Sequence, residues 1–232
     1  MKIRIKFGKY GAMKFIGHLD IMRYFQKAIR RADIPISYSG GYSPHMIMSF
    51  ASPLGVGLTS DGEYMDIEAK ECLPSAEAIR RLNEVMVDGM KVFSYRQLPE
   101  DAGNAMSLVA AADYLVSFRE GCAPAPAWQD RLEDFFSQSE IPILKKTKKS
   151  ETIVDIKPMI HSLALCEGDI ISMRLSAGSA DNLKPELVMQ AFAAFIGFEL
   201  PPFGIRVHRK DLYARMEGNL LPLEALGDDI GE

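Results

Sequence analysis

Residues 10–58, YGAMKFIGHLDIMRYFQKAIRRADIPISYSGGYSPHMIMSFASPLGVGL, decide the fold that the sequence predicts. Gly17-His18-Leu19-Asp20 is typical of a helix start, because short polar groups and a carboxylate suit the free N–H groups of a first turn. The apolar residues that follow predict a buried face for a helix at about 18–32, formed by Leu19, Met22, Phe25, Ala28, Ile29 and Ala32. The other face carries Arg23, Lys27, Arg30 and Arg31.

Strand signals on both sides of this helix give a β-α-β-β-α-β order. Basic and apolar residues alternate over 2–7 and predict a half-exposed strand. Further strands are expected at 34–38, 46–52, 63–69 and 90–95. Ser75 is expected to cap the second helix. The order is typical of a ferredoxin-like sandwich, with helices on one face of an antiparallel sheet.

The same order of elements recurs after a linker at 99–107. Strands are expected at 113–118, 141–144, 152–156, 163–166, 170–175 and 205–208, and helices at 127–136 and from Pro185 onward. We therefore predict an α+β protein with two ferredoxin-like units in tandem. The N-terminal domain is placed at 1–98, the C-terminal domain at 108–214, and an acidic tail at 215–232.

Composition points to a cytoplasmic protein with no membrane partner. No apolar run approaches the length of a membrane span, and the N-terminus leads into a strand pattern rather than a signal peptide. Cys72, Cys122 and Cys166 are far apart and odd in number, which argues against a disulfide framework.

The charge is unevenly distributed along the chain. Residues 1–50 hold nine Lys and Arg against two Asp, a net of +7, so that the total of −4 leaves −11 for the rest. A concentrated basic region with aromatic residues among the cations favours binding to RNA phosphates and bases. The candidate contacts are Lys14, Arg23, Lys27, Arg30, Arg31, Tyr42 and His45, with a second basic cluster at Lys145, Lys146, Lys148 and Lys149.

His18, Asp20 and His45 form the best candidate catalytic or metal-binding set, if the two turns that carry them meet at one sheet edge. One alternative is that His18 caps the helix and His45 satisfies loop backbone; another is that a histidine acts as general base in RNA cleavage. The spacing matches no metal motif, and the chain has no Walker A loop and no G-x-G-x-x-G. We therefore expect no metal and no cofactor.

Several motifs together resemble the radical SAM-linked protein family, a domain of unknown function. They are residues 14–23 (KFIGHLDIMR), 28–32 (AIRRA), 41–45 (GYSPH), 49–54 (SFASPL), 62–64 (GEY), 155–158 (DIKP) and 182–186 (NLKPE). The resemblance implies an RNA-related accessory role beside a radical SAM enzyme and brings no activity with it. The chain has no cysteine cluster for an iron–sulfur centre, so it is not expected to be that enzyme.

The leading hypothesis is an accessory RNA-binding or substrate-presenting module that acts with a radical SAM enzyme. An RNA-cleaving or metal-dependent enzyme centred on His18, Asp20 and His45 is the rival class. A pure protein-interaction adaptor is the third, and its mark would be a large exposed apolar patch.

Overall fold

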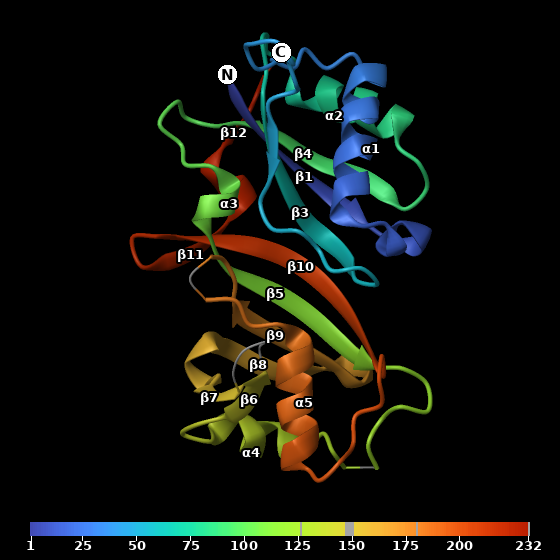
Figure 1. Cartoon of the computed structure of the whole chain (residues 1–232), viewed down its shortest axis with the longest axis vertical. Coiled ribbons are helices and arrows are strands. Elements are labelled where there is room, and N and C mark those ends of the chain that lie inside the picture. The colour runs from blue at the N-terminus through green and yellow to red at the C-terminus, as the bar shows by residue number, and fades with distance from the viewer. Residues whose placement is uncertain (126, 147–150, 180, 232) are drawn as a thin grey trace. The chain divides into compact units, whose positions relative to one another are not determined.

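The computed structural model describes residues 1–125, 127–146, 151–179 and 181–231. Over these residues the protein has a mixed α+β fold with a large, mostly antiparallel sheet and five α-helices, which confirms the predicted α+β class (Figure 1). The chain forms two compact units, one of Met1–Ala110 with Arg209–Glu232 and one of Ala111–His208. In the described ranges, no helix is long and apolar enough to span a membrane.

The first unit contains elements from both ends of the chain. They are β1 (Lys2–Lys9), the 3-10 helix η1 (Gly11–Phe15), α1 (His18–Arg31), β2 (Met48–Phe50), β3 (Thr59–Glu68), α2 (Ser75–Val85), β4 (Met90–Gln97), α3 (Ala105–Leu108), β10 (Ile205–Met216) from Arg209 onward, β11 (Asn219–Pro222), the 3-10 helix η4 (Leu223–Leu226) and β12 (Asp228–Asp229). The strand order is β12-β4-β1-β3-β10, with β2 also on β3 and β11 on β10. β1 pairs antiparallel with β3 and β4, as β2 does with β3.

An aromatic cluster between α1 and the sheet forms the centre of the first unit's core. The ring of Phe25 lies 4.6 Å from that of Phe7 and 5.8 Å from that of Phe50, measured between centroids. α1 begins at His18 as predicted, and it buries Ile21 together with Phe25. Burial of large apolar side chains on one helix stripe stabilises such a unit far more than helix propensity does.

Leu19 is the one large side chain of the predicted helix face that turns outward. It is 66% exposed, so its assignment to the buried face was wrong. The physical reason is helical geometry, because Leu19 precedes Arg23 by four residues and therefore lies on the same side of α1 as that cation.

Two local predictions also need correction. The Ser75 side chain does not cap α2; its hydroxyl donates to the Tyr95 carbonyl at 2.5 Å and accepts from the Ile230 N–H at 2.9 Å. Residues 34–38 make only the isolated bridges of Ile36 with Ala69 and of Tyr38 with Met46. A proline at position 35 supplies no N–H to a ladder, which accounts for the missing strand.

The second unit has its own strands, helices and core. Its elements are β5 (Val109–Phe118) from Ala111 onward, α4 (Arg131–Ser137), β6 (Pro142–Lys146), β7 (Glu151–Asp155), β8 (Ile160–Cys166), β9 (Ile170–Ser176), α5 (Pro185–Phe195) and the first residues of β10. β9 pairs antiparallel with β5 and β8, whereas β6 and β7 form a separate hairpin. The rings of Trp128 and Phe135 lie 6.1 Å and 5.4 Å from that of Phe192 and fill this unit's core.

The C-terminal residues, predicted as an acidic tail at 215–232, are folded into the first unit. Leu223 is completely buried, and β12 pairs with β4. The unit boundaries therefore differ from the predicted domains at 1–98 and 108–214, because residues from Arg209 onward return to the N-terminal unit.

Arg4 on β1 holds the returning segment in place. Its guanidinium is 1% exposed and pairs with both carboxylate oxygens of Asp66, at 2.8 and 2.9 Å. It also donates to the carbonyl oxygens of Leu223 at 3.2 Å and Gly103 at 3.3 Å. One buried side chain thus joins β1, β3, the segment before α3, and η4.

We predict that Arg4→Ala lowers the free energy of unfolding by about 3–5 kcal/mol, because it leaves the Asp66 carboxylate half-buried without its partner. Arg80→Ala, which breaks an exposed pair with Glu77, should cost less than about 1 kcal/mol. Urea denaturation followed by circular dichroism measures both values. Equal losses for the two variants would show that the Arg4 pair is not structurally decisive.

Candidate nucleic-acid interface

The cations of β1 make contacts inside the first unit. The Lys2 ammonium donates to the carbonyl oxygens of Glu100 at 2.7 Å and Ala102 at 2.8 Å. Arg4 is buried against Asp66. The basic region of residues 1–50 is therefore smaller on the surface than its net charge of +7 suggests.

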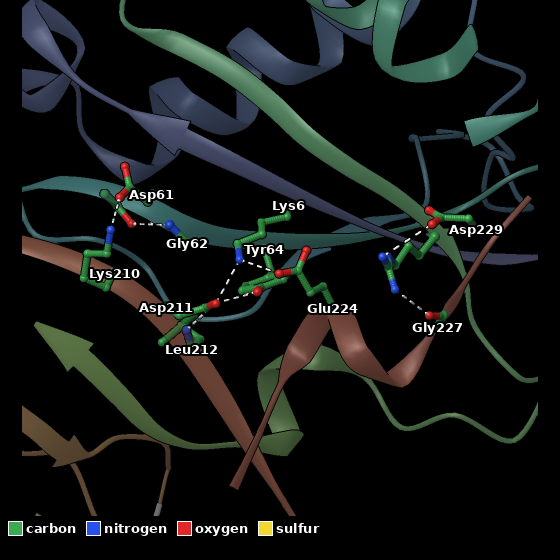
Figure 2. Close-up of polar contacts among 12 residues, drawn as sticks. Lys6, Asp61, Gly62, Tyr64, Lys210, Asp211, Leu212, Glu224, Gly227 and Asp229 are labelled. Carbon is green, nitrogen blue, oxygen red and sulfur yellow. Dashed lines mark hydrogen bonds and ion pairs between the residues drawn. The ribbon is translucent and has the colours of Figure 1, made fainter. Parts of the chain in front are cut away.

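Lys6 lies at the centre of a polar network on the same side of the sheet (Figure 2). Its ammonium contacts Asp211 at 2.8 Å and Glu224 at 2.6 Å, and the Tyr64 hydroxyl donates to Asp211 at 2.5 Å. Burial works against the charge of Lys6, but the hydrogen bonds to Asp211 and Glu224 outweigh it and raise the pKa of this ammonium. Burial, then the charge of Asp211, raises the pKa of the Tyr64 phenol.

Asp61 of β3 binds an aromatic hydroxyl and a second lysine. The Tyr10 hydroxyl donates to Asp61 Oδ1 at 2.7 Å, and Lys210 contacts Asp61 Oδ2 at 2.8 Å. Burial is the main cause that raises the pKa of Tyr10, and the hydrogen bond to Asp61 adds to it. Tyr10 is thus held by the protein itself.

The outer face of α1 keeps its cations exposed. Arg23 is 71% exposed and pairs with Asp20 at 3.1 Å, one helical turn away. Lys27, Arg30 and Arg31 are exposed, and among the described residues none of them has an ion-pair partner. We call Arg23, Lys27, Arg30 and Arg31 the α1 stripe.

The exposed arginines of α2 show the contrast within the same unit. Arg80 pairs with Glu77 at 2.8 Å, and Arg81 contacts the same carboxylate at 2.7 Å. Hydrogen bonds from Arg80 and then Arg81 lower the pKa of Glu77 to about 2. The helix α2 therefore presents cations with matching anions, while most of the α1 stripe has none.

The other predicted RNA contacts are placed less uniformly. Lys14 is half-buried, with its ammonium 5.1 Å from the centroid of the Phe15 ring. Tyr42 is fully exposed. Lys145 and Lys146 belong to β6 in the second unit, whereas Lys148 and Lys149 lie outside the described residues.

His18, Asp20 and His45 each engage a different neighbour. The His18 ring lies edge-on to Phe50 with centroids 5.3 Å apart, and Asp20 pairs with Arg23. His45 is exposed, with Nδ1 2.8 Å from the Ser39 hydroxyl. No three His, Cys, Asp or Glu side chains of the described chain come close enough to hold a metal ion.

An exposed apolar group at the start of α1 was missed in the sequence. Phe15 is 64% exposed, Leu19 66% and Val56 61%. The loop of Val56 is joined to Lys14 by the hydrogen bond from the Gly57 N–H to the Lys14 carbonyl at 2.8 Å. The spacing of Leu19 with Arg23 was the signal that could have found part of it.

The fold and surface define an α+β protein with an exposed basic helix. Residues 2–185 match the model of a family described as an uncharacterized protein conserved in bacteria (DUF2344). The chain belongs to this family. No curated protein matches the chain.

One solved structure that the chain resembles is "Crystal Structure of a Cbf5-Nop10-Gar1 Complex". The TM-score is 0.49 at 10% sequence identity, over 90% of this chain and 48% of the matched chain. The chain thus spans about half the length of the protein it matches there.

We predict that Tyr10, Tyr64 and Tyr95 stay protonated in the folded protein at about pH 11, above the ordinary tyrosine pKa. Burial raises all three pKa values, that of Tyr95 to about 12. Because these folded pKa values exceed the unfolded ones, the stability they contribute is complete below about pH 10 and is lost as the pH rises through them. Tyrosinate absorbance and circular dichroism, recorded together, measure this.

Tyr10→Phe supplies the control for this titration. It should reduce the number of phenols that ionise late from three to two. Ionisation of all eight tyrosines near pH 10 in a still-folded protein would contradict the account.

Proposed function

We propose that the protein is an accessory module that binds RNA through the α1 stripe. The observation that carries this proposal is the difference between the cations of α1 and those of β1 and α2. Lys27, Arg30 and Arg31 are exposed without carboxylate partners in the described chain, whereas the cations of β1 and α2 are held by the protein's own groups. Unpaired exposed cations release counterions when they meet phosphates, which drives binding to nucleic acids.

Helical geometry makes the stripe continuous. Arg23, Lys27 and Arg30 or Arg31 follow at steps of three or four residues, so the Cβ atoms of neighbouring members lie about 5–6 Å apart along one face. Such a row can follow a phosphate backbone without reading its sequence. The exposed Tyr42 ring offers a surface on which a base can stack.

We infer further that both units are ferredoxin-like. The order β4-β1-β3-β2 in the first unit supports this, as does the order β10-β5-β9-β8 in the second unit, with the β6-β7 hairpin as an insertion. Proteins of this general shape commonly bind RNA on the open sheet face. In the first unit that face carries Arg4 and Lys6 beneath η4, which favours the helix side as the binding surface.

The proposed partner is a radical SAM enzyme in RNA or ribosome-related metabolism. This part rests on the sequence motifs quoted above, including residues 14–23 and 41–45, and on no contact in the structure. The module would then hold an RNA substrate while the partner enzyme modifies it.

A protein-interaction adaptor is a second candidate, and the apolar group of Phe15, Leu19 and Val56 favours it. The rival enzyme centred on His18, Asp20 and His45 would need a rearrangement that brings these residues together. Cleavage of labelled RNA that His45→Ala abolishes would favour that enzyme over the RNA-binding module.

We predict that the triple variant Arg23→Ala, Lys27→Ala, Arg30→Ala weakens RNA binding on the order of tenfold or more at moderate salt. The slope of log affinity against log salt should become shallower by about 1–2, because Lys27 and Arg30 no longer release counterions from RNA and Arg23 adds to this only when its pair with Asp20 opens. Fluorescence anisotropy with total cellular RNA at several salt concentrations measures both quantities.

The matched control is Arg80→Ala, Arg81→Ala on α2, whose cations are already neutralised by Glu77 and Glu84. This control should bind RNA as the wild type does. Equal affinities and slopes for the triple variant and wild type would mean that the α1 stripe is only a solvated surface.

A further inference from the structure

One lysine of β1 is buried and forms no ion pair with a carboxylate of the described residues. Lys9 is 3% exposed, and its ammonium donates to the Ile16 carbonyl at 2.8 Å. The pairing register of β1 with β3 shifts between Phe7 and Lys9. Such a bulge re-aims the side chain that follows it, and bulges of this kind are common beside functional sites.

The carboxylate whose charge acts on the Lys9 ammonium, that of Glu63, already forms an ion pair with another residue. Glu63 accepts two hydrogen bonds from Arg209, one of them at 2.8 Å from Nε, and both side chains are buried. Arg209 and Glu63 cancel, so Lys9 leaves one net positive charge in the interior. Burial lowers the pKa of Lys9, the Glu63 charge opposes this, and the Arg209 charge adds to it.

A small cleft reaches this charge from the surface. It has a volume of about 20 Å³, and its lining includes Lys9, His18, Ser52, Leu54 and Glu63. That volume holds one water-sized atom. The cleft lies at the start of α1, because its lining includes His18 and the carbonyl that Lys9 contacts belongs to Ile16, just before the Gly17 N-cap. Among the described residues, no side chain caps this helix end.

We propose that this cleft is a phosphate-binding site, in which one anionic oxygen of a phosphate group enters beside the Lys9 ammonium. The buried positive charge and the positive end of the α1 dipole both favour an anion at this point. Only one phosphate oxygen fits the space, so the rest of the group stays outside the cleft. The site does not depend on the α1 stripe and can exist whether or not the stripe binds RNA.

A purely structural Lys9 makes a different prediction from an anion-binding one. A lysine that only braces the Ile16 carbonyl would make the protein insensitive to phosphate. If Lys9 instead serves to bind an anion, replacing it with an apolar side chain of similar size should change the free energy of unfolding little, because a buried charge is itself destabilising.

The test compares thermal unfolding of the wild type, Lys9→Met and Lys91→Met in inorganic phosphate and in chloride at equal ionic strength. Lys91 is exposed on β4 and serves as the control. We expect phosphate to raise the melting temperature of the wild type and Lys91→Met by several degrees. Lys9→Met should fold and bind phosphate at least about tenfold more weakly.

A second arm distinguishes free phosphate from a nucleic-acid phosphate, using short oligonucleotides with a 5′-phosphate or a 5′-hydroxyl. Tighter binding of the phosphorylated form that Lys9→Met abolishes assigns the site to an RNA end. Phosphate stabilisation without that preference assigns it to free phosphate. If Lys9→Met does not fold, Leu54→Trp, which narrows the cleft, takes its place and should abolish the stabilisation by phosphate. No stabilisation and no preference in the wild type, or full stabilisation of the variant that lacks Lys9 or has the narrowed cleft, would overturn the proposal.

Discussion

The pairing of β1 cations with acids from distant parts of the chain is the constraint on which the first unit depends. Arg4 meets Asp66, and Lys6 meets Asp211 and Glu224. Two of these acids follow β1 by more than 200 residues, so the pairs fix where β10 and η4 settle on the sheet. Once the C-terminal segment is in place, each partner is removed from water, and loss of one would leave the other unpaired.

This internal pairing also decides what the surface can do. Because Arg4 and Lys6 of β1 and the arginines of α2 are neutralised within the unit, the α1 stripe stands out as a row of exposed cations that is largely unmatched by carboxylates of the described chain. The Lys9 cleft adds a buried positive charge at the other end of the same helix.

Local patterns in the sequence predicted the local structure well, and long-range partners were outside their reach. The spacing of apolar residues predicted α1 and α5, because the buried face of a helix recurs every three or four residues. Alternation in β1 identified a strand but could not say whether Lys6 faces water or Asp211, since that acid lies 205 positions away. The acidic end of the chain was predicted as a tail for the same reason.

The site was predicted in part. Helical spacing predicted that the residues of the α1 stripe share an outer face, and all of them are exposed in the structure. Leu19 was misassigned because it begins the helix, where the apolar repeat has only one turn to define its direction. His18, Asp20 and His45 were grouped on the expectation that two turns meet, and each makes its contacts elsewhere.

Lysine footprinting by mild reductive methylation, with and without RNA, distinguishes an RNA-binding α1 stripe from a merely solvated one. We predict that Lys27 is modified rapidly in the free protein and protected by RNA, while Lys6 resists modification in both states. Rapid modification of Lys6 in the folded protein, or no protection of Lys27 when RNA is bound, would contradict it.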